Sequence, residues 1–324
     1  MSSVSNENYN IVEQAVFGYY EGHRLLRSSV RLTTNDEYEL AALSDLAPGV
    51  SISGTESYLS GSQLPGGFYA LVRTWLAQEM PRPGCVWSHI LLIPSATMST
   101  QVDLTPLLSL FRRPHGYKAD DGFSEPLKIE KRPTDIPAPD ARLVAAALRE
   151  AYQSVSIDTS KLDAEKWERA IIAVWSQQWP RLRRKFVFRS ASSSYGLPGQ
   201  SVGRVERGQS VSPQADGWLD SAVADAVSRS ITPLKRFLWR YGKDIDAADN
   251  AFADLVELHV AEATNGPDAI VERVFARFAK GQAETLKGDL LGLGGRVSLV
   301  GIANLSIRSK LLAQGFTYPR PPSG

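Results

Sequence analysis

Cysteine is nearly absent from this sequence, because Cys85 is the only one among 324 residues. A single cysteine excludes an internal disulfide framework and is typical of a protein in a reducing cytoplasm. Net charge is nearly absent too, since 36 basic residues stand against 35 acidic ones. A chain with this balance has no overall attraction to nucleic acid or to anionic lipid.

Segments that direct a chain to a membrane are also missing. The opening MSSVSNENYNIVEQ has neither the basic stretch nor the apolar stretch of a signal peptide. The longest apolar runs, such as AVFGYY and ILLIP, are far shorter than the ~20 residues that span a bilayer. We therefore expect a cytoplasmic protein with no membrane partner.

Common motifs for nucleotide, metal and hydrolytic sites do not occur. The sequence contains no GxxxxGK[ST], no HExxH, no CxxC and no GxSxG. The segment GLGGRVS at 292–298 lacks the lysine of a phosphate-binding loop and follows no strand, so it predicts a helix break. We predict no cofactor, no bound metal and no nucleotide hydrolysis by this chain.

Composition predicts how the chain is divided. Residues 192–216 are rich in Ser, Gly, Pro and Gln, which is typical of a linker or a long exposed loop. We predict an α+β domain at 11–191 before this linker and a helical domain at 217–316 after it, with a disordered start at 1–10 and a disordered tail at 317–324. The later segments are amphipathic, with prolines where helices start and glycines where they stop, and they predict an all-α helical bundle.

Strands dominate the prediction for the first domain. Two apolar segments, FYALVRTWL and CVWSHILLI, flank a proline-rich connection, and prolines cannot donate to a ladder. They predict a hairpin at the centre of a mostly antiparallel sheet, with Cys85, Trp87 and His89 on one face. Two short strands are predicted around Glu21-Gly22, and an edge strand in PLKIEK. A helix is predicted in TTNDEYELAALSDLA, with Tyr38, Ala42 and Leu46 along one face.

The spacing of Cys85 and His89 has the count of a zinc half-site, but a strand makes the pair unsuitable. Four residues of a strand span ~13 Å, whereas two ligands of one zinc each lie ~2.0–2.3 Å from the metal. A nucleophile and its base need contact at ~3 Å. We therefore predict that Cys85 is a buried apolar side chain.

Two histidines remain as candidates for chemistry. His23 follows the tight turn in YYEGH, and His89 lies inside the central strand. Two histidines on neighbouring strands can meet across a sheet and flank a ligand, with Asp45 or Arg73 nearby. We predict that their imidazoles lie within ~10 Å of each other, which is the reach of side chains across one or two strands. The alternative interpretation is structural: each histidine donates its ring N–H to a backbone carbonyl in the core.

A basic cluster lies in WPRLRRKFVFRS. It offers Arg181, Arg183, Arg184 and Lys185 beside aromatic residues, and such a mixture can hold phosphates and stacked bases. Because the whole chain is close to neutral, we expect an acidic protein surface rather than nucleic acid as the partner of these four residues.

Several stretches together resemble a known family: FGYYEGHRLLRSS, LAALSDL, FYALVRTWLAQEMPRPGCVWSHILLI and WPRLRRKFVFRS. They are similar to the N-terminal domain of the bacterial GTPase-associated protein family, over about Gln14 to Ser190. Family members usually carry a gly-his turn, a ser-asp pair and a trp-thr-his strand. Here these fall on Gly22-His23, Ser44-Asp45 and Trp87-Ser88-His89, so that Ser88 departs from the pattern but keeps a hydroxyl.

The resemblance implies a non-enzymatic adaptor in a multi-gene antiviral defence system built around a GTPase. Its partners would be proteins, among them a GTPase and effector subunits on other polypeptides, which accounts for the missing phosphate-binding loop. The alternative hypothesis is a hydrolase or transferase that uses His23 and His89 with Asp45 and Arg73. Convergence of these four side chains on one pocket would favour the enzyme, and four separately satisfied side chains would favour the adaptor.

Overall fold

The computed structural model describes residues 10–50, 57–80, 82–114, 121–129, 136–153, 155, 157, 162–193, 200–204, 217–246, 251–266 and 268–291. The chain divides into two compact units. The first, here called the sheet unit, contains Met1–Gln177 and Arg183–Val211, and the second, here called the helical unit, contains Gln178–Leu182 and Ser212–Gly324. The predicted tail at 317–324 lies outside the described residues, as does the predicted start apart from residue 10.

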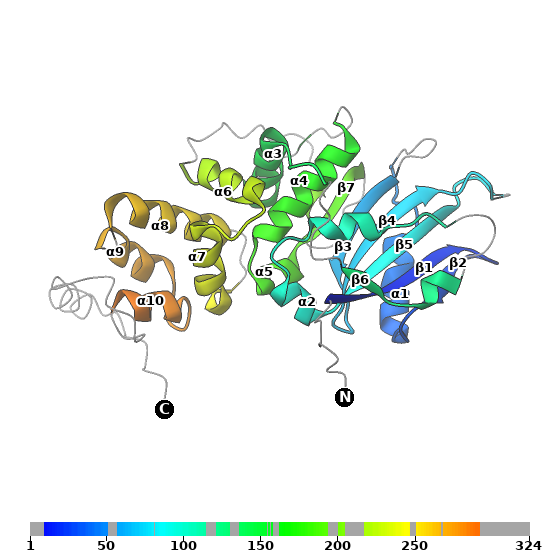
Figure 1. The fold of residues 1–324 in the computed structure, drawn as a ribbon, viewed down its shortest axis with the longest axis horizontal. Coiled ribbons are helices and arrows are strands. Elements are labelled where there is room, and N and C mark those ends of the chain that lie inside the picture. The colour runs from blue at the N-terminus through cyan, green and yellow to red at the C-terminus, as the bar shows by residue number, and fades with distance from the viewer. Residues whose placement is uncertain are drawn as a thin grey trace, which may run out of the picture. The chain divides into compact units, whose positions relative to one another are not determined.

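The sheet unit contains a mixed sheet of eight strands with the order β2-β1-β5-β4-β3-β7-β8, and β6 also pairs with β1 (Figure 1). Its strands are β1 (Asn10–Tyr19), β2 (His23–Ser28), β3 (Ser57–Gln63), β4 (Tyr69–Leu76), β5 (Val86–Ile93), β6 (Leu127–Ile129), β7 (Val187–Ser193) and β8 (Gln200–Arg204). Every described pair is antiparallel except β7 with β8, which is parallel. The predicted central hairpin is confirmed as β4 and β5, and the predicted edge strand as β6.

Strand β1 pairs with three other strands. On one side it pairs with β5. Its later residues pair with β2 on the other side, and its first residues pair with β6. The β1–β2 connection is the tight turn expected at Glu21-Gly22, where both residues have positive φ, 53° and 122°. Residues 200–204 form β8 although they lie within the range predicted as a linker.

Helices cover both faces of the sheet. The helices and 3-10 turns of this unit are α1 (Thr34–Ser44), α2 (Ser95–Thr100), η1 (Thr105–Leu110), η2 (Asp121–Ser124), α3 (Ala141–Gln153) and α4 (Ala164–Gln177), while α5 (Pro180–Lys185) crosses the division between the units. On one face, Leu40 and Leu43 of α1 pack on a core that includes Phe17 and Ile90. On the other face, Trp175 of α4 stacks on Tyr69 of β4, with 4.5 Å between ring centroids.

Helix α1 exposes part of the face that the sequence predicts for Tyr38, Ala42 and Leu46. Thr33 caps the helix by accepting a hydrogen bond from the Asp36 N–H, and Leu40 and Leu43 supply the buried contacts. Tyr38, in contrast, is 77% exposed, and Ala42 on the same side is exposed too. The face that carries Tyr38 and Ala42 is therefore the outer one, where the Tyr38 hydroxyl reaches water, while Leu46 lies beyond the end of α1 and is half-buried.

The helical unit contains α6 (Gly217–Ser228), α7 (Pro233–Tyr241), η4 (Gly242–Asp244), α8 (Ala251–Asn265), α9 (Asp268–Arg277) and α10 (Glu284–Leu290). Helix α8 contacts α6, α7 and α9, and α10 contacts α9 and α7. Thr232 caps α7 ahead of Pro233, as the sequence predicts for a helix start. Arg240 of α7 forms an ion pair with the buried Asp289 of α10 at 2.6 Å.

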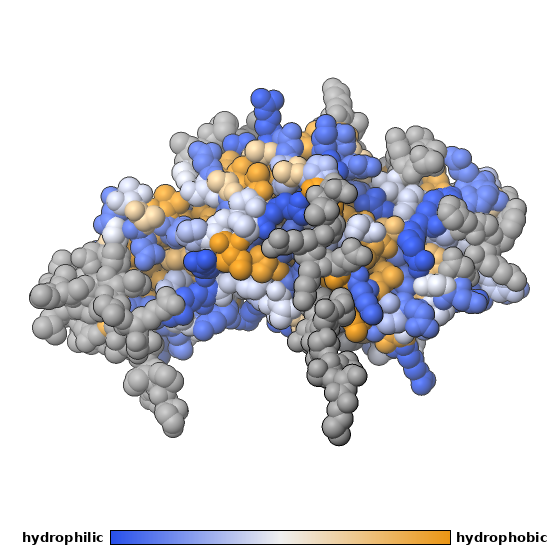
Figure 2. Space-filling model, viewed as in Figure 1, coloured by the Kyte–Doolittle hydropathy of each residue, from blue (hydrophilic) through white to orange (hydrophobic). Residues whose placement is uncertain are grey.

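Surface side chains of this protein are mixed in character. Hydrophilic and apolar residues are interspersed over the face drawn in Figure 2. Among the described residues, the exposed large apolar side chains are Ile11, Tyr20, Tyr38 and Ile231. In the same part of the chain, no helix has the length and apolar character needed to cross a bilayer.

Candidate functional site

The register of β1 places His23 and His89 on opposite faces of the sheet. His89 lies opposite Val16 of β1, and His23 lies opposite Tyr19. Because successive side chains of a strand alternate between faces, positions 16 and 19 project to opposite sides. The prediction that the two imidazoles share a site is therefore wrong. The four candidates instead divide into two groups, Arg73 with His89 and Asp45 with His23.

Both ring nitrogens of His89 are occupied by neighbours in the core. The backbone N–H of Arg112 donates to Nδ1 at 3.1 Å, so Nε2 carries the proton and donates to the side-chain oxygen of Gln14 at 2.8 Å. The amide nitrogen of Gln14 donates in turn to the carbonyls of Gly122 and Glu125. His89 thus tethers β5 to β1 and, through Gln14, to the segment around η2.

The surroundings of His89 keep its ring neutral. The residue is 0% exposed, and its ring makes edge-to-face contacts with the rings of Phe111 and Phe123. Burial, assisted by the positive charge of Arg112, lowers the pKa of His89 to about 3. A histidine with two hydrogen-bond partners and no path to solvent cannot exchange protons with a substrate, so His89 is a structural residue of the core.

Arg73 lies directly opposite His89 on β4 and is already engaged. Its guanidinium forms an ion pair with Glu168 of α4 at 2.6 Å, donates to the Ser57 hydroxyl at 2.9 Å, and lies over the ring of Phe111. The Glu168 side chain is only 3% exposed. Burial raises the pKa of Glu168, and the charge of Arg73 offsets only part of that rise. Arg73 therefore joins the sheet to α4.

The family motifs meet on the other face of the sheet, at the end of α1. His23 Nε2 lies 2.8 Å from the Ser44 hydroxyl. The Ser88 hydroxyl donates to the Ser44 carbonyl at 2.5 Å and lies 2.9 Å from the Thr74 hydroxyl. We call His23, Ser44, Thr74 and Ser88 the hydroxyl cluster. Each of the three motifs contributes one residue to it, on β2, α1 and β5.

Tyr58 on β3 extends these contacts to the residues after α1. Its hydroxyl donates to the Asp45 carbonyl at 3.2 Å and accepts from the Ala47 N–H at 3.0 Å. Burial raises the pKa of Tyr58. A helix end has carbonyls without helical partners, and here Ser88 and Tyr58 satisfy two of them. The contact of Ser88 also explains why serine can stand where threonine is usual, since it needs only a hydroxyl.

Ser44, His23 and Asp45 are the residue types of a nucleophilic triad, but their geometry opposes that chemistry. Ser44 is 0% exposed. The Asp45 carboxylate accepts from the Leu46 N–H, and no ion pair or hydrogen bond within the described residues joins it to His23. Ser44 also lies at the C-terminal end of α1, where the helix dipole disfavours a developing alkoxide. The cluster holds the end of α1 in place.

His23 is the member of the cluster that reaches the surface, because its side chain is half-buried. Burial lowers the pKa of His23, and the nearby charge of Asp45 works against that shift. Its ring also lies 5.9 Å from the ring of Phe17. The carbonyl partner expected for a core histidine is replaced by a serine hydroxyl.

The predicted basic cluster contains one buried residue and three exposed ones. Arg183 is 0% exposed. Its guanidinium donates to four carbonyls near the ends of α2 and α4, those of Met98, Gln101, Val102 and Ser176. Arg183 is therefore a structural cation, because carbonyls at helix ends attract positive charge. Arg181, Arg184 and Lys185 are exposed, and Arg181 forms an ion pair with Asp246 at 2.7 Å.

Cys85 is half-buried rather than buried, which corrects the prediction. It precedes β5, beside the connection from β4, and packs at the margin of the core that contains Trp87. The described residues include no group of three or more His, Cys, Asp and Glu side chains suited to a metal ion.

The sheet unit is thus a mixed-sheet domain in which motif residues fix one helix to the strands. Residues 11–111 match the family model of GTPase-associated protein 1, N-terminal domain type 1. The range contains β1 apart from its first residue, β2 to β5, α1 and every residue of the hydroxyl cluster, so the resemblance is confirmed there. No curated protein and no solved structure matches the chain.

Proposed function

We propose that this chain is a non-enzymatic adaptor in a bacterial GTPase-centred antiviral defence system. The sheet unit binds a trigger or a partner protein, and the helical unit, as an all-α bundle, relays that contact to effector subunits in the cytoplasm. The match of residues 11–111 to a GTPase-associated domain carries this proposal. The absence of a phosphate-binding loop from the sequence supports a GTPase on a separate polypeptide.

The hydroxyl cluster supports an adaptor rather than a histidine-based enzyme. The alternative hydrolase or transferase requires His23, His89, Asp45 and Arg73 around one pocket, and the two faces of the sheet separate them. The motif residues that do meet are used to hold α1 against the strands. A firmly held helix is a suitable platform for a partner, because a preorganised surface loses little entropy on binding.

The outer face of α1 is the surface that we assign to the GTPase. Tyr38 projects from it at 77% exposure, with Glu37, Glu39 and Asp45 exposed around it. Tyrosine is enriched among the residues that dominate binding energy, and α1 itself carries no basic residue. The occupant should therefore present Lys or Arg side chains, whose charges complement the acidic residues and can lie over the Tyr38 ring.

Co-purification tests this proposal. The tagged full-length chain would be co-expressed with a GTPase encoded beside it in the genome, and the complex measured by size-exclusion chromatography and calorimetry. We expect a complex that Tyr38→Ala weakens by at least about tenfold, as expected for loss of a dominant aromatic contact. Tyr20→Ala is the matched control, because Tyr20 is 56% exposed outside α1. Absence of a complex, or GTP hydrolysis by the purified chain alone, would contradict the proposal.

A further inference from the structure

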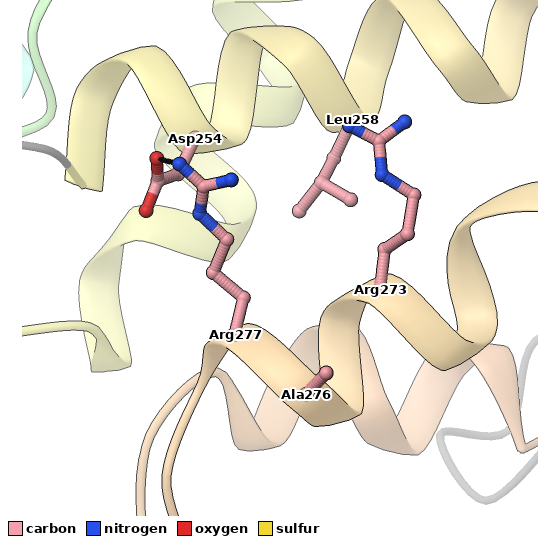
Figure 3. Close-up of a pocket in the computed structure, with 5 residues that line it drawn as sticks. All are labelled: Asp254, Leu258, Arg273, Ala276 and Arg277. Carbon is pink, nitrogen blue, oxygen red and sulfur yellow. Dashed lines mark hydrogen bonds and ion pairs between the residues drawn. The ribbon is translucent and has the colours of Figure 1, made fainter.

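A pocket of about 340 Å³ lies between α8 and α9 of the helical unit. It is lined by Asp254 and Leu258 from α8 and by Arg273, Ala276 and Arg277 from α9. Figure 3 shows both arginine side chains extending from α9 toward α8, with Arg277 reaching Asp254 and Arg273 ending beside Leu258. The volume is at the lower end of the ~300–1,000 Å³ found for small-molecule sites. The pocket therefore suits one side chain or a small ligand.

The two arginines differ in how they are held. Arg277 has two ion pairs, one with Asp254, which is only 8% exposed, and one with Glu257 at 3.7 Å. Within the described residues, Arg273 has a single ion pair, with Glu257 at 3.6 Å, and its side chain is 49% exposed. An exposed pair at that distance contributes little. The guanidinium of Arg273 can therefore exchange this contact for a ligand without a large cost.

The space between the arginines is apolar. Leu258 is 1% exposed and forms its wall on α8, while Ala276 is exposed and leaves room on α9 because its side chain is a single methyl. A ligand must therefore combine a short aliphatic part with a group that an arginine recognises. The planar guanidinium matches a carboxylate with two parallel hydrogen bonds.

We propose that this pocket binds a carboxylate on a short aliphatic stem, as in a glutamate side chain of a partner protein. The carboxylate pairs with Arg273 in place of Glu257, the stem packs on Leu258 and Ala276, and the ion pair with Asp254 keeps Arg277 extended at the pocket edge. This inference concerns the helical unit alone and does not depend on the GTPase.

Calorimetric titration of the full-length chain tests the site. The probes are a capped five-residue peptide with glutamate between two leucines, the same peptide with glutamine, and free glutarate. We expect the glutamate peptide to bind about tenfold more tightly than the glutamine peptide, as for a hydrogen bond to a charged group. Stronger binding of glutarate than of the peptide would retain the carboxylate site and assign it to a free dicarboxylate.

Two variants and one control keep the result interpretable. Arg273→Gln should abolish the preference for glutamate, and Ala276→Leu should abolish binding by filling the space while leaving the charge unchanged. Arg236→Gln removes another exposed arginine, on α7, and should bind as the unmodified chain does. Equal binding of both peptides, or unchanged binding by both pocket variants with unaltered thermal unfolding, would overturn the proposal.

Discussion

His89 and His23 lie on neighbouring parts of the same sheet, yet their surroundings have almost nothing in common. His89 is 0% exposed, is held at both nitrogens, and shares its face with an ion pair between Arg73 and Glu168. His23 is half-buried and has a serine hydroxyl as its partner. Charge and aromatic packing surround His89, whereas small neutral hydroxyls lie around His23, at the margin of the apolar core under α1.

This difference indicates how strongly a substitution on each face should change the stability of the protein. A buried charge without its partner is strongly unfavourable, because the group has lost its hydration and gains nothing in return. Leaving a hydroxyl without its hydrogen-bond partner reduces the free energy of unfolding much less. The His89 face should therefore respond sharply to substitution and to pH, and the His23 face only mildly.

The largest effect should come from Arg73→Met on the His89 face. The substitution leaves the buried Glu168 without its ion-pair partner, with the Ser190 hydroxyl as its remaining donor. We expect a loss of about 3–5 kcal/mol in the free energy of unfolding, measured with urea at pH 7. The double variant Arg73→Met with Glu168→Leu should recover part of the loss, since no charge is then left in the core. Arg24→Met, an exposed change on β2, is the control, and an equally small loss at both arginines would remove the contrast between the faces.

The second effect is a pH dependence that belongs to His89. The unfolded chain protonates this histidine near pH 6.5, whereas the folded chain does so only at about 3. Between those values the unfolded state binds the extra proton, so stability falls as pH decreases. We expect the unmodified protein to lose about 2 kcal/mol from pH 7 to pH 5 that His89→Gln does not lose.

His23→Gln provides the comparison for that experiment. The pKa of His23 is also lowered by burial, but its side chain is half-buried and Asp45 opposes the shift. Removing His23 should therefore take away a smaller part of the pH dependence. Equal slopes for the two variants would mean that the two histidines are buried alike.

The smallest effect should come from Ser88→Ala in the hydroxyl cluster. The substitution removes the donor to the Ser44 carbonyl and the partner of Thr74, and we expect a loss of about 1 kcal/mol. Hydrogen exchange should accelerate at residues 41–47, at the end of α1. Ser99→Ala, which removes an exposed hydroxyl bonded to the Ser95 carbonyl, should change neither quantity. An unaltered exchange rate in Ser88→Ala would show that the cluster does not hold the helix.

Much of the sheet unit could be predicted from the sequence. The β4–β5 hairpin follows from two apolar runs around prolines, and alternation correctly places Trp87 and His89 on one face. The relation between His23 and His89 could not be predicted in the same way. It depends on the register of β1 with two different strands, and β2 contains a bulge where Leu26 has no partner across the ladder.

The burial of charged residues could not be predicted from the sequence for a related reason. Arg183 belongs to a basic run whose composition is typical of an exposed surface. Nothing local in the sequence indicates the four carbonyls that surround it, because they lie at or just after the ends of α2 and α4. The sequence does not indicate a site at the pocket arginines of α9 either. Arg273 and Arg277 are one turn apart on one helix, but the apolar wall depends on Leu258 of α8.

The double pairing of β1 has a consequence for the order of folding. Asn10 pairs with Ile129 and Val16 pairs with His89, so the ladders that β1 forms with β6 and β5 join residues far apart in the chain. Closing such long loops reduces the conformational entropy of the chain before the contacts form, and this cost slows folding. During synthesis β1 leaves the ribosome well before β5 and β6, with only β2 beside it. An unpaired strand edge is a template for association with other chains, so the nascent chain is exposed to aggregation until β5 arrives.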